Sequence, residues 1–263
     1  MARFWLVLSL SLFVASFSVA QTSTVSDLQA LTLAERSIAA MTAGSAVSDV
    51  TLSGSATWVA GSDTETGPAT LTAKGTTESR VDLNLSGGER TEVRSSADGS
   101  PQGDLIKDGG AATVEAAHNC FTDTAWFFPP LSSLAELSVS GFLASYMGQE
   151  SLNGIAVQHL RIWQSVSSQD ASAAKAIIHL STIDWYLDSA TFLPVAAKFT
   201  THPPETFGVD MPVEILFSNY QRVNGVLLPL HIQKLLNGGL TLDLTISSAV
   251  LNSGLSDSDF NLQ

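Results

Sequence analysis

The side chains most able to do chemistry in this 263-residue chain fall into two short motifs. His118-Asn119-Cys120 places an imidazole, an amide and a thiol together, but a cysteine nucleophile also needs a lowered pKa and a base within hydrogen-bond reach. Ser172-Ala173-Ala174-Lys175 matches S-x-x-K, yet it lies in a polar stretch between predicted strands and lacks the S-D-N and K-T-G motifs that accompany it. We interpret Cys120 as a core or surface thiol and Ser172 as a chance match, and predict no catalytic residue.

The other histidines, His159, His179, His202 and His231, are scattered singly. Two or three of them could meet on a metal ion in space, but strand alternation does not force them to do so. Asp257-Ser258-Asp259 offers too few ordered oxygen ligands for a cation loop and is expected to be a solvated tail. Since Cys120 is the sole cysteine, an intramolecular disulfide and C-x-x-C motifs are excluded. The sequence predicts neither a metal site nor a cofactor.

The N-terminus has the features of a secretory signal peptide. Arg3 supplies a positive charge, residues 4–14 are apolar, and Ser18-Val19-Ala20 places small residues before a cleavage site. The apolar run is shorter than the roughly 20 residues of a membrane span. We predict that residues 1–20 are removed on export, to a Gram-negative periplasm or to the medium, with no stable membrane insertion afterwards.

The amino-acid composition limits the classes of partner that the protein can bind. The chain carries 12 Lys and Arg against 25 Asp and Glu, a formal net charge of −13, and such a surface repels phosphate backbones and anionic membranes. Nucleic acid is therefore excluded as a partner. Because 44% of residues are hydrophobic and 14% are charged, the chain is expected to be globular, with residues 21–263 forming one domain.

Residues 24–42 are predicted to form an amphipathic helix. Ser26 with Gln29 matches a capping box, and Gly44 follows as a stop signal. Such a helix must pack on an apolar surface. Its apolar stripe consists of Val25, Leu28, Leu31, Ala34, Ile38 and Met41.

From Val50 onward the apolar period changes to two, which is typical of strands with one buried face. Asn224-Gly225 indicates a tight hairpin, and residues 80–94 are expected to form another with one wet face. About ten antiparallel strands result, and open twisted sheets of that size tend to curl. The expected strands are 50–59, 68–77, 80–86, 90–94, 154–166, 176–187, 192–201, 213–223, 226–236 and 240–247.

Residues 109–149 interrupt this pattern and are dense in aromatic residues. Helical turns are expected within 111–120 and 131–138, while Pro129 keeps Phe128 extended. The aromatic side chains either plug the open side of the sheet, the interpretation we favour, or form a lid over a cavity for an apolar ligand. The candidate ligand-binding residues are Trp58, Phe121, Trp126, Phe127, Phe128, Phe142, Tyr146 and Trp163.

Two motifs resemble those of the LolA/LolB/RseB-like superfamily of exported proteins. Residues 185–194, WYLDSATFLP, are similar to its W-x-D-x-x-T-x-L-P strand-turn-strand, and residues 217–229 are similar to its F-S-x-Y…G-x-x-x-P hairpin. The resemblance implies an unclosed antiparallel barrel with helices across its mouth and a lipid or acyl chain in a hydrophobic cavity. It does not extend to a ligand-gating arginine at any position that we can identify.

The overall prediction is a mainly β (α+β) protein. It has one curved sheet forming an unclosed barrel, which the helix at 24–42 and the 109–149 insertion cover. The expected function is non-enzymatic binding or transport of a lipid or other acyl-chain ligand in the cell envelope. Two alternatives remain open: an interaction or sensor module that engages an envelope protein through a sheet edge, and, less favoured, a hydrolase that uses Cys120 or Ser172.

Overall fold

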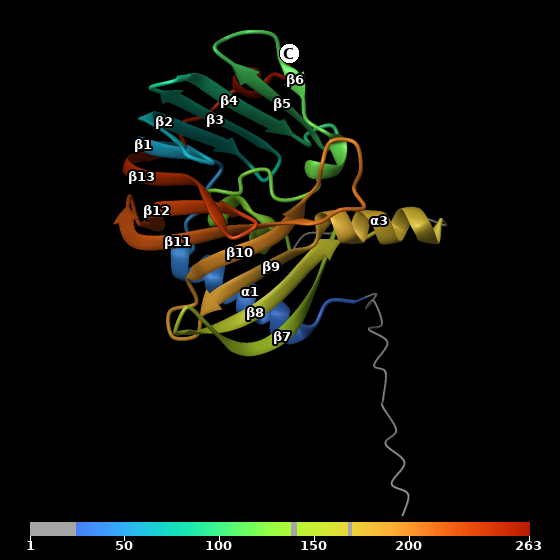
Figure 1. Ribbon diagram of the computed structural model, residues 1–263. Coiled ribbons are helices and arrows are strands. Elements are labelled where there is room, and N and C mark those ends of the chain that lie inside the picture. The colour runs from blue at the N-terminus through green and yellow to red at the C-terminus, as the bar shows by residue number, and fades with distance from the viewer. Residues whose placement is uncertain (1–24, 138–140, 168–169) are drawn as a thin grey trace, which may run out of the picture.

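The computed structural model describes residues 25–137, 141–167 and 170–263 (Figure 1). The predicted signal peptide, residues 1–20, lies outside the described residues. The helical elements are α1 (Leu28–Thr42), η1 (Ala117–Asn119), η2 (Pro129–Leu131), α2 (Ser133–Glu136), α3 (Ala171–Ser181) and η3 (Asp257–Phe260).

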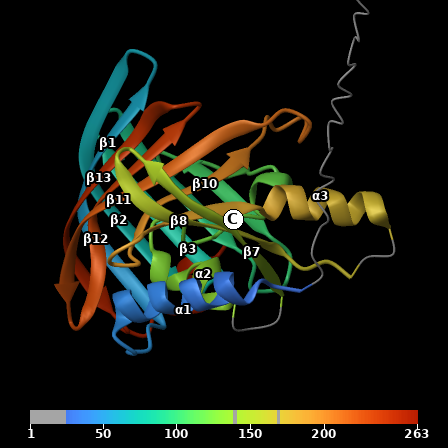
Figure 2. The same ribbon diagram turned by 90° about the horizontal axis from the view of Figure 1, so that it is seen from below.

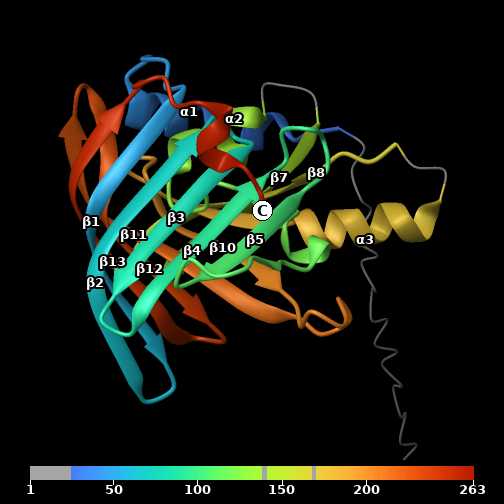
Figure 3. The same ribbon diagram turned by 90° about the horizontal axis from the view of Figure 1, so that it is seen from above.

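All described strands belong to one antiparallel sheet in the order β6-β5-β4-β3-β2-β1-β13-β12-β11-β10-β9-β8-β7. The sheet curves strongly, and its end strands β6 and β7 are not paired with each other in the described residues (Figure 3). This confirms the predicted unclosed sheet. The strands are β1 (Asp49–Ala60), β2 (Asp63–Lys74), β3 (Glu78–Leu85), β4 (Gly88–Ser95), β5 (Gln102–Lys107), β6 (Thr113–Val114), β7 (Phe142–Leu152), β8 (Ile155–Gln164), β9 (Ile183–Asp188), β10 (Pro194–Thr201), β11 (Met211–Val223), β12 (Val226–Leu236) and β13 (Gly239–Leu251).

The sheet contains thirteen strands rather than about ten, because β5 and β6 at one end and β7 at the other were not predicted. Thr113 pairs with Leu105 to form β6 in a segment that we expected to be helical, and β-branched residues favour this extended state. At the other end, β7 begins at Phe142, so the irregular middle of the chain ends before the predicted limit at 149. We call residues 115–137, between β6 and β7, the middle segment.

The strongest local signal in the sequence is confirmed. Val223 pairs with Val226 across Asn224-Gly225, whose φ angles of 48° and 92° are those of a tight hairpin turn. Further along the sheet, β1 meets β13 at a bulge next to Gly54. A Cβ at Gly54 would lie 2.1 Å from the carbonyl oxygen of Thr245, so the close strand approach requires glycine.

Helix α1 covers the concave side of the sheet, where it contacts β7, β12, η2 and α2 (Figure 2). The helix is shorter than predicted, and the predicted Ser26–Gln29 capping box is wrong. Asp27 is the N-cap and accepts a hydrogen bond from the Gln29 backbone N–H at 2.7 Å. The Ser26 hydroxyl instead accepts a hydrogen bond from the Ala144 backbone N–H on β7 at 3.1 Å.

The middle segment lies between α1 and the sheet and fills much of the core. Phe127 and Phe128 are fully buried there, among aliphatic side chains from the concave face such as Leu71 and Ile215. Trp185 on β9 faces the same core, and its indole N–H donates to the Ser133 hydroxyl at 3.1 Å. The helix and the middle segment together cover the concave face, as predicted.

One further expectation is wrong and another is partly right. Residues 176–181 are part of α3 rather than of a strand, because Asp170 caps the N–H groups of Ser172 and Ala173 and alanine-rich sequence follows. Helix α3 contacts β8 and β10 (Figure 1). The C-terminal acidic motif is exposed to solvent, as expected, but it is not a loose tail, since it forms η3, which buries Phe260 and contacts β3 and β4.

Candidate functional site

The concave face contains a hollow that side chains leave unfilled. This cavity of about 460 Å³ lies between the middle segment and strands of the β1–β5 and β12–β13 region. Its size is within the usual range of small-molecule sites. We call it the Trp126 hollow and define it by Trp58, Leu83, Arg90, Leu105, Trp126 and Lys234.

The walls of the Trp126 hollow combine apolar surface with positive charge. Arg90, Lys107 and Lys234 line it, against the single carboxylate of Glu92. Three of the chain's 12 basic residues thus gather at one cavity of a protein whose net charge is −13. Such a concentration attracts a negatively charged group, whereas the rest of the acidic surface repels it.

Each tryptophan of the hollow is paired with a cation. The Arg90 guanidinium lies 4.0 Å from the Trp58 ring centroid, and the Lys234 ammonium lies 4.6 Å from that of Trp126. Arg90 also donates to both carboxylate oxygens of Glu65, at 2.9 and 3.0 Å. Neither Lys234 nor Lys107 forms an ion pair in the described part of the chain, although the charge of Lys234 favours the ionised form of the Glu115 carboxyl.

The charged side chains of β4 do not lie on the face that the sequence predicts. Val81 pairs with Glu92 and Leu83 pairs with Arg90, and residues directly opposite each other share a face of the sheet. The charged residues of β4 therefore lie on the same concave face as the apolar residues of β3. The predicted hairpin is confirmed, since Leu85 pairs with Gly88 across its turn. The prediction that one of its faces is wet is wrong, because η3 covers the face opposite the concave side and Val93 is buried there.

A buried arginine fixes the middle segment beside the hollow. Arg94 on β4 is only 4% exposed and donates to the backbone carbonyls of Asn119 at 3.0 Å and Asp123 at 3.3 Å. Ser79 on β3 adds a hydrogen bond to the carbonyl of Thr124 at 2.8 Å. These contacts hold the chain immediately before Trp126 against the sheet and so position the indole.

Asp123 provides a second anchor for this segment. Its carboxylate accepts hydrogen bonds from the backbone N–H and the hydroxyl of Ser133, at 2.9 and 3.0 Å. Burial nevertheless raises the pKa of Asp123 to about 7, because removal from water disfavours the charged form. The carboxyl group therefore titrates near neutral pH.

The eight predicted ligand-binding residues have different positions. Trp58 and Trp126 line the Trp126 hollow, whereas Phe127 and Phe128 are core residues. Phe142 and Tyr146, on β7, pack at the edge of the same core.

Two of the eight lie elsewhere. Phe121 is half-buried, and its carbonyl accepts a weak hydrogen bond from Gln164 at 3.5 Å. Trp163 alternates with the core residue Ile162 and therefore faces the opposite side of the sheet. A ligand role for each of the eight stays a prediction.

A larger cavity, of about 630 Å³, lies beside α3 and is lined by Trp163, Arg161 and Lys198. Its charged groups are already paired. Asp184 accepts from Arg161 at 2.8 and 2.9 Å, and Lys198 contacts Glu214 at 3.0 Å. Since these cations are neutralised within the protein, the smaller Trp126 hollow is the better candidate for a charged amphiphile.

The two nucleophile candidates lack the surroundings that catalysis needs. The Cys120 thiol donates to Glu115 at 3.6 Å, and burial raises its pKa to about 12, so it is protonated at neutral pH. The His118 imidazole instead lies 3.1 Å from the carbonyl oxygen of Pro203. Ser172 lies in the first turn of α3, where its backbone N–H donates to Asp170.

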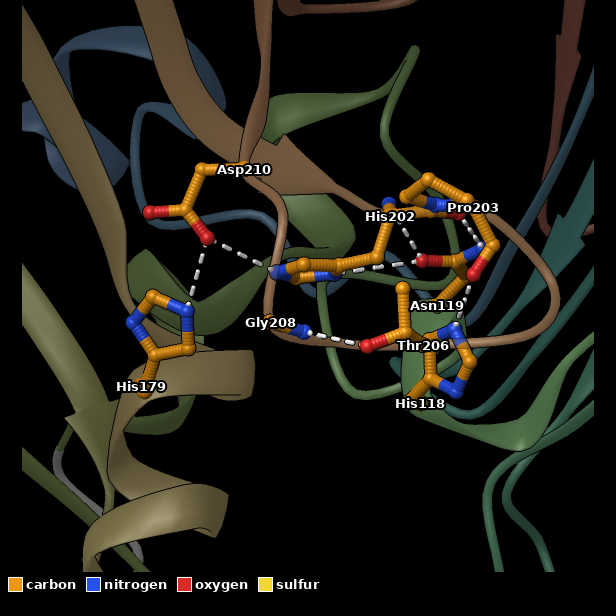
Figure 4. A network of polar contacts seen from close by, with 8 residues as sticks. All are labelled: His118, Asn119, His179, His202, Pro203, Thr206, Gly208 and Asp210. Atoms are coloured by element: carbon orange, nitrogen blue, oxygen red, sulfur yellow. Dashed lines mark hydrogen bonds and ion pairs between the residues drawn. The ribbon is translucent and has the colours of Figure 1, made fainter.

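One arrangement was missed because it depends on tertiary structure. His179, at the end of α3, and His202, after β10, both point at the carboxylate of Asp210 (Figure 4). His179 is separated from His202 by β9 and β10, and His202 from Asp210 by a loop, so nothing in their spacing indicates that they meet. Across the described residues, no helix has the length and apolar character needed to cross a membrane.

Comparison with solved structures identifies the fold. A putative outer membrane lipoprotein-sorting protein domain from Vibrio parahaemolyticus is 15% identical, with a TM-score of 0.57, 88% of this chain and 95% of that chain being covered. A DUF1329 family protein from Desulfovibrio piger is 12% identical and has a TM-score of 0.55. The match covers 89% of this chain and 96% of that chain. A LolA superfamily protein from Nitrosomonas europaea is 12% identical and has a TM-score of 0.51. The match covers 89% of this chain and 97% of that chain.

No family model and no curated protein matches the sequence. The structural likenesses extend over nearly the whole described chain and show a LolA/LolB/RseB-like fold, as the sequence motifs predicted.

Proposed function

We propose that this chain, whose fold is LolA/LolB/RseB-like, is a non-enzymatic carrier or binding protein for an amphiphile with an acyl chain and an anionic head group. The ligand would occupy the Trp126 hollow. The observation that carries this proposal is the combination of tryptophan walls with the unpaired ammonium group of Lys234. Apolar walls stabilise an acyl chain by removing it from water, and the cation binds the head group.

The path of the ligand follows from the lining of the hollow. Leu105 on β5 is 44% exposed and lies at the outer side, whereas Trp126 is 4% exposed and lies at the inner side. Lys107 follows Leu105 toward the end of the same strand. We infer that the acyl chain packs against Trp126 and Leu83, with the head group between Lys107 and Lys234.

We further propose that the chain acts outside the cytosol as one domain comprising residues 21–263, after removal of residues 1–20. The n-region, h-region and small residues of the leader support export. The continuous sheet from β6 to β7 supports a single domain. The structural similarity to a putative outer membrane lipoprotein-sorting protein domain is consistent with a function in the cell envelope.

The alternative function, recognition of a protein through a sheet edge, is less well supported. The outer edge of β7 is already engaged at Ala144, whose carbonyl accepts from the Asp27 N–H at 2.9 Å and whose N–H donates to Ser26. A bulge at Gly148, with φ of 122°, distorts the strand further along. Both features hinder the pairing of an added strand.

The direct test is native mass spectrometry of the protein purified from its own envelope, followed by organic extraction. Co-purification of an anionic acyl species in the wild-type protein, and its loss in the Lys234→Gln variant, is the expected result. Recovery of ligand-free protein that also fails to take up anionic acyl chains added in vitro would refute the carrier function. A neutral species that remains bound to Lys234→Gln would refute the proposed role of the cation.

A further inference from the structure

Three side chains from separate elements converge on one point beside α3 (Figure 4). The Nε2 atom of His179 lies 3.0 Å from Asp210 Oδ1, and the Nε2 atom of His202 lies 3.2 Å from the same oxygen. The potential ligand atoms of the three residues all lie within 4.8 Å of one another. In the described residues this is the single group of at least three such side chains with that geometry.

The distances suit a small divalent ion. Zn²⁺ binds imidazole nitrogen and carboxylate oxygen at about 2.1 Å, so ligand atoms around a tetrahedral ion are about 3.4 Å apart. The separations of 3.0 and 3.2 Å need to widen by a few tenths of an ångström, and the two histidine nitrogens, which lie within 4.8 Å of each other, need to settle at the same spacing. His179 and Asp210 have exposed side chains, 42% and 49%, and can move by that amount.

Asn119 holds the buried histidine in an orientation that suits a metal ligand. Its side chain is held in one orientation, because Oδ1 accepts from the His202 backbone N–H at 2.8 Å and Nδ2 donates to the His202 carbonyl at 2.9 Å. The same Oδ1 lies 3.3 Å from His202 Nδ1 and can accept its N–H. In the tautomer that makes this hydrogen bond, the lone pair is on Nε2, which faces Asp210.

The contact between His202 and Asp210 can hold either a proton or a metal ion. Its length of 3.2 Å fits a hydrogen bond in the metal-free protein, and a metal ion would replace that proton between the ring nitrogen and the carboxylate. The His202 side chain is fully buried, so it cannot turn toward solvent. Outer hydrogen bonds that orient a histidine, like those of Asn119, are typical of metal sites.

We propose that His179, His202 and Asp210 bind one Zn²⁺ ion, with Asn119 orienting His202 from the outer shell. Two imidazoles and one carboxylate with a fourth, open position form a known type of zinc donor set. His179 and Asp210 also line both the cavity beside α3 and a shallower hollow of about 440 Å³ next to Phe207. The open position therefore faces solvent, and water completes the coordination.

The ion would connect three parts of the molecule. His179 ends α3, His202 and Asp210 are the two ends of the loop between β10 and β11, and Asn119 belongs to the middle segment. The zinc proposal does not rest on lipid binding, because the Trp126 hollow shares no lining residue with the zinc site. Binding of zinc to the folded state should also raise the thermal unfolding midpoint.

The test is isothermal titration of ZnCl₂ into tag-free protein that has been stripped with a chelator. We expect one zinc ion per chain. His179→Ala and Asp210→Asn, both at exposed positions that the fold does not need, should abolish stoichiometric binding while circular dichroism stays unchanged. Asn119→Ala should weaken zinc binding by about 10- to 100-fold if it acts from the outer shell.

His231→Ala is the matched control. His231 also lies 3.1 Å from an aspartate, Asp243, but the residues that the structure describes place no third ligand there, so zinc binding should be unaffected. Co²⁺ provides a second readout, since the visible absorption of a tetrahedral complex should disappear in His179→Ala. The proposal is overturned if the wild-type protein binds no zinc, or if His179→Ala and Asp210→Asn bind it as the wild-type protein does. An equal loss in His231→Ala would also overturn it.

Discussion

The ammonium nitrogen of Lys234 lies 4.6 Å from the centroid of the Trp126 indole, at the wall of a cavity on the concave face of the sheet. A cation above an aromatic face stays close to apolar surface while it keeps its charge. The same position allows one ligand to contact the indole with its chain and the ammonium with its head group.

Lys234→Gln should therefore weaken binding of a long-chain carboxylate by about tenfold, because a hydrogen bond to a charged group is lost. Binding of the corresponding long-chain alcohol should change little. Fluorescent-probe displacement measures both affinities. Lys175→Gln on α3, distant from the hollow, is the matched control and should bind both ligands normally. Equal weakening of the two ligands by Lys234→Gln would contradict the head-group role.

Filling the hollow should abolish ligand binding without weakening the fold. Ala111 lines the cavity from an exposed position, so Ala111→Trp adds bulk without leaving a void in the core. We expect this variant to lose uptake of an apolar naphthylamine dye while its thermal midpoint stays within about 2 °C of the wild type, as for a surface change. Ala111→Ser should take up the dye normally. Undiminished uptake by Ala111→Trp would place the dye elsewhere.

Phe128 is predicted to serve the core rather than the ligand. It is fully buried, and its replacement by alanine should cost about 3–5 kcal/mol of unfolding free energy, measured by urea denaturation. Phe207→Ala is the control, because this side chain is 51% exposed and surface changes usually stay within about 0.5 kcal/mol. A small effect at Phe128 would indicate a mobile lid in place of a packed plug.

Asp123 should make stability fall as the pH rises toward neutrality. Its pKa is raised to about 7 in the folded protein from the ordinary value of 3.8, so the folded state binds the proton more tightly than the unfolded state. The stabilisation is complete below about pH 4 and is lost as the pH rises through about 7. Between about pH 5 and pH 8 the loss amounts to roughly 3 kcal/mol.

Asp123→Asn removes this titration. Urea denaturation at the two pH values should show a smaller decrease for the variant than for the wild-type protein, and the difference between them isolates Asp123 from other titrating groups. Identical pH dependence in the two proteins would mean that Asp123 stays ionised throughout.

Local signals in the sequence determined much of the fold. The Asn224-Gly225 turn and the alternation in β12 and β13 each follow from a few neighbouring residues, and both are present. The predicted apolar stripe of α1 is only partly right, because Ala34 and Met41 are buried whereas Val25 and Leu28 are 74% and 79% exposed. The errors occurred where a second signal was overlooked. Asp170 caps α3 within a stretch that was expected to be a strand, and η3 buries Phe260 at the C-terminus.

The candidate site was harder to predict, because it depends on which face each strand presents. Alternation along β4 separates Arg90 from Thr91, but only pairing with Leu83 places Arg90 on the concave side. The meeting of His179 with His202 similarly depends on how α3 packs against β8 and β10. The aromatic richness of residues 121–128 was visible in the sequence, whereas the division into core residues and cavity-lining residues was not.

Tryptophan fluorescence gives the most direct test of the central claim. A long-chain fatty acid with bromine on its acyl chain quenches only the indoles that it contacts. Quenching is expected in the wild-type protein and in Trp163→Phe, because Trp58 and Trp126 line the hollow while Trp163 faces the other side of the sheet. It should disappear in Trp58→Phe/Trp126→Phe, in which Trp185 is enclosed in the core. Undiminished quenching in that double variant, or none in the wild-type protein, would contradict the assignment of the Trp126 hollow as the ligand site.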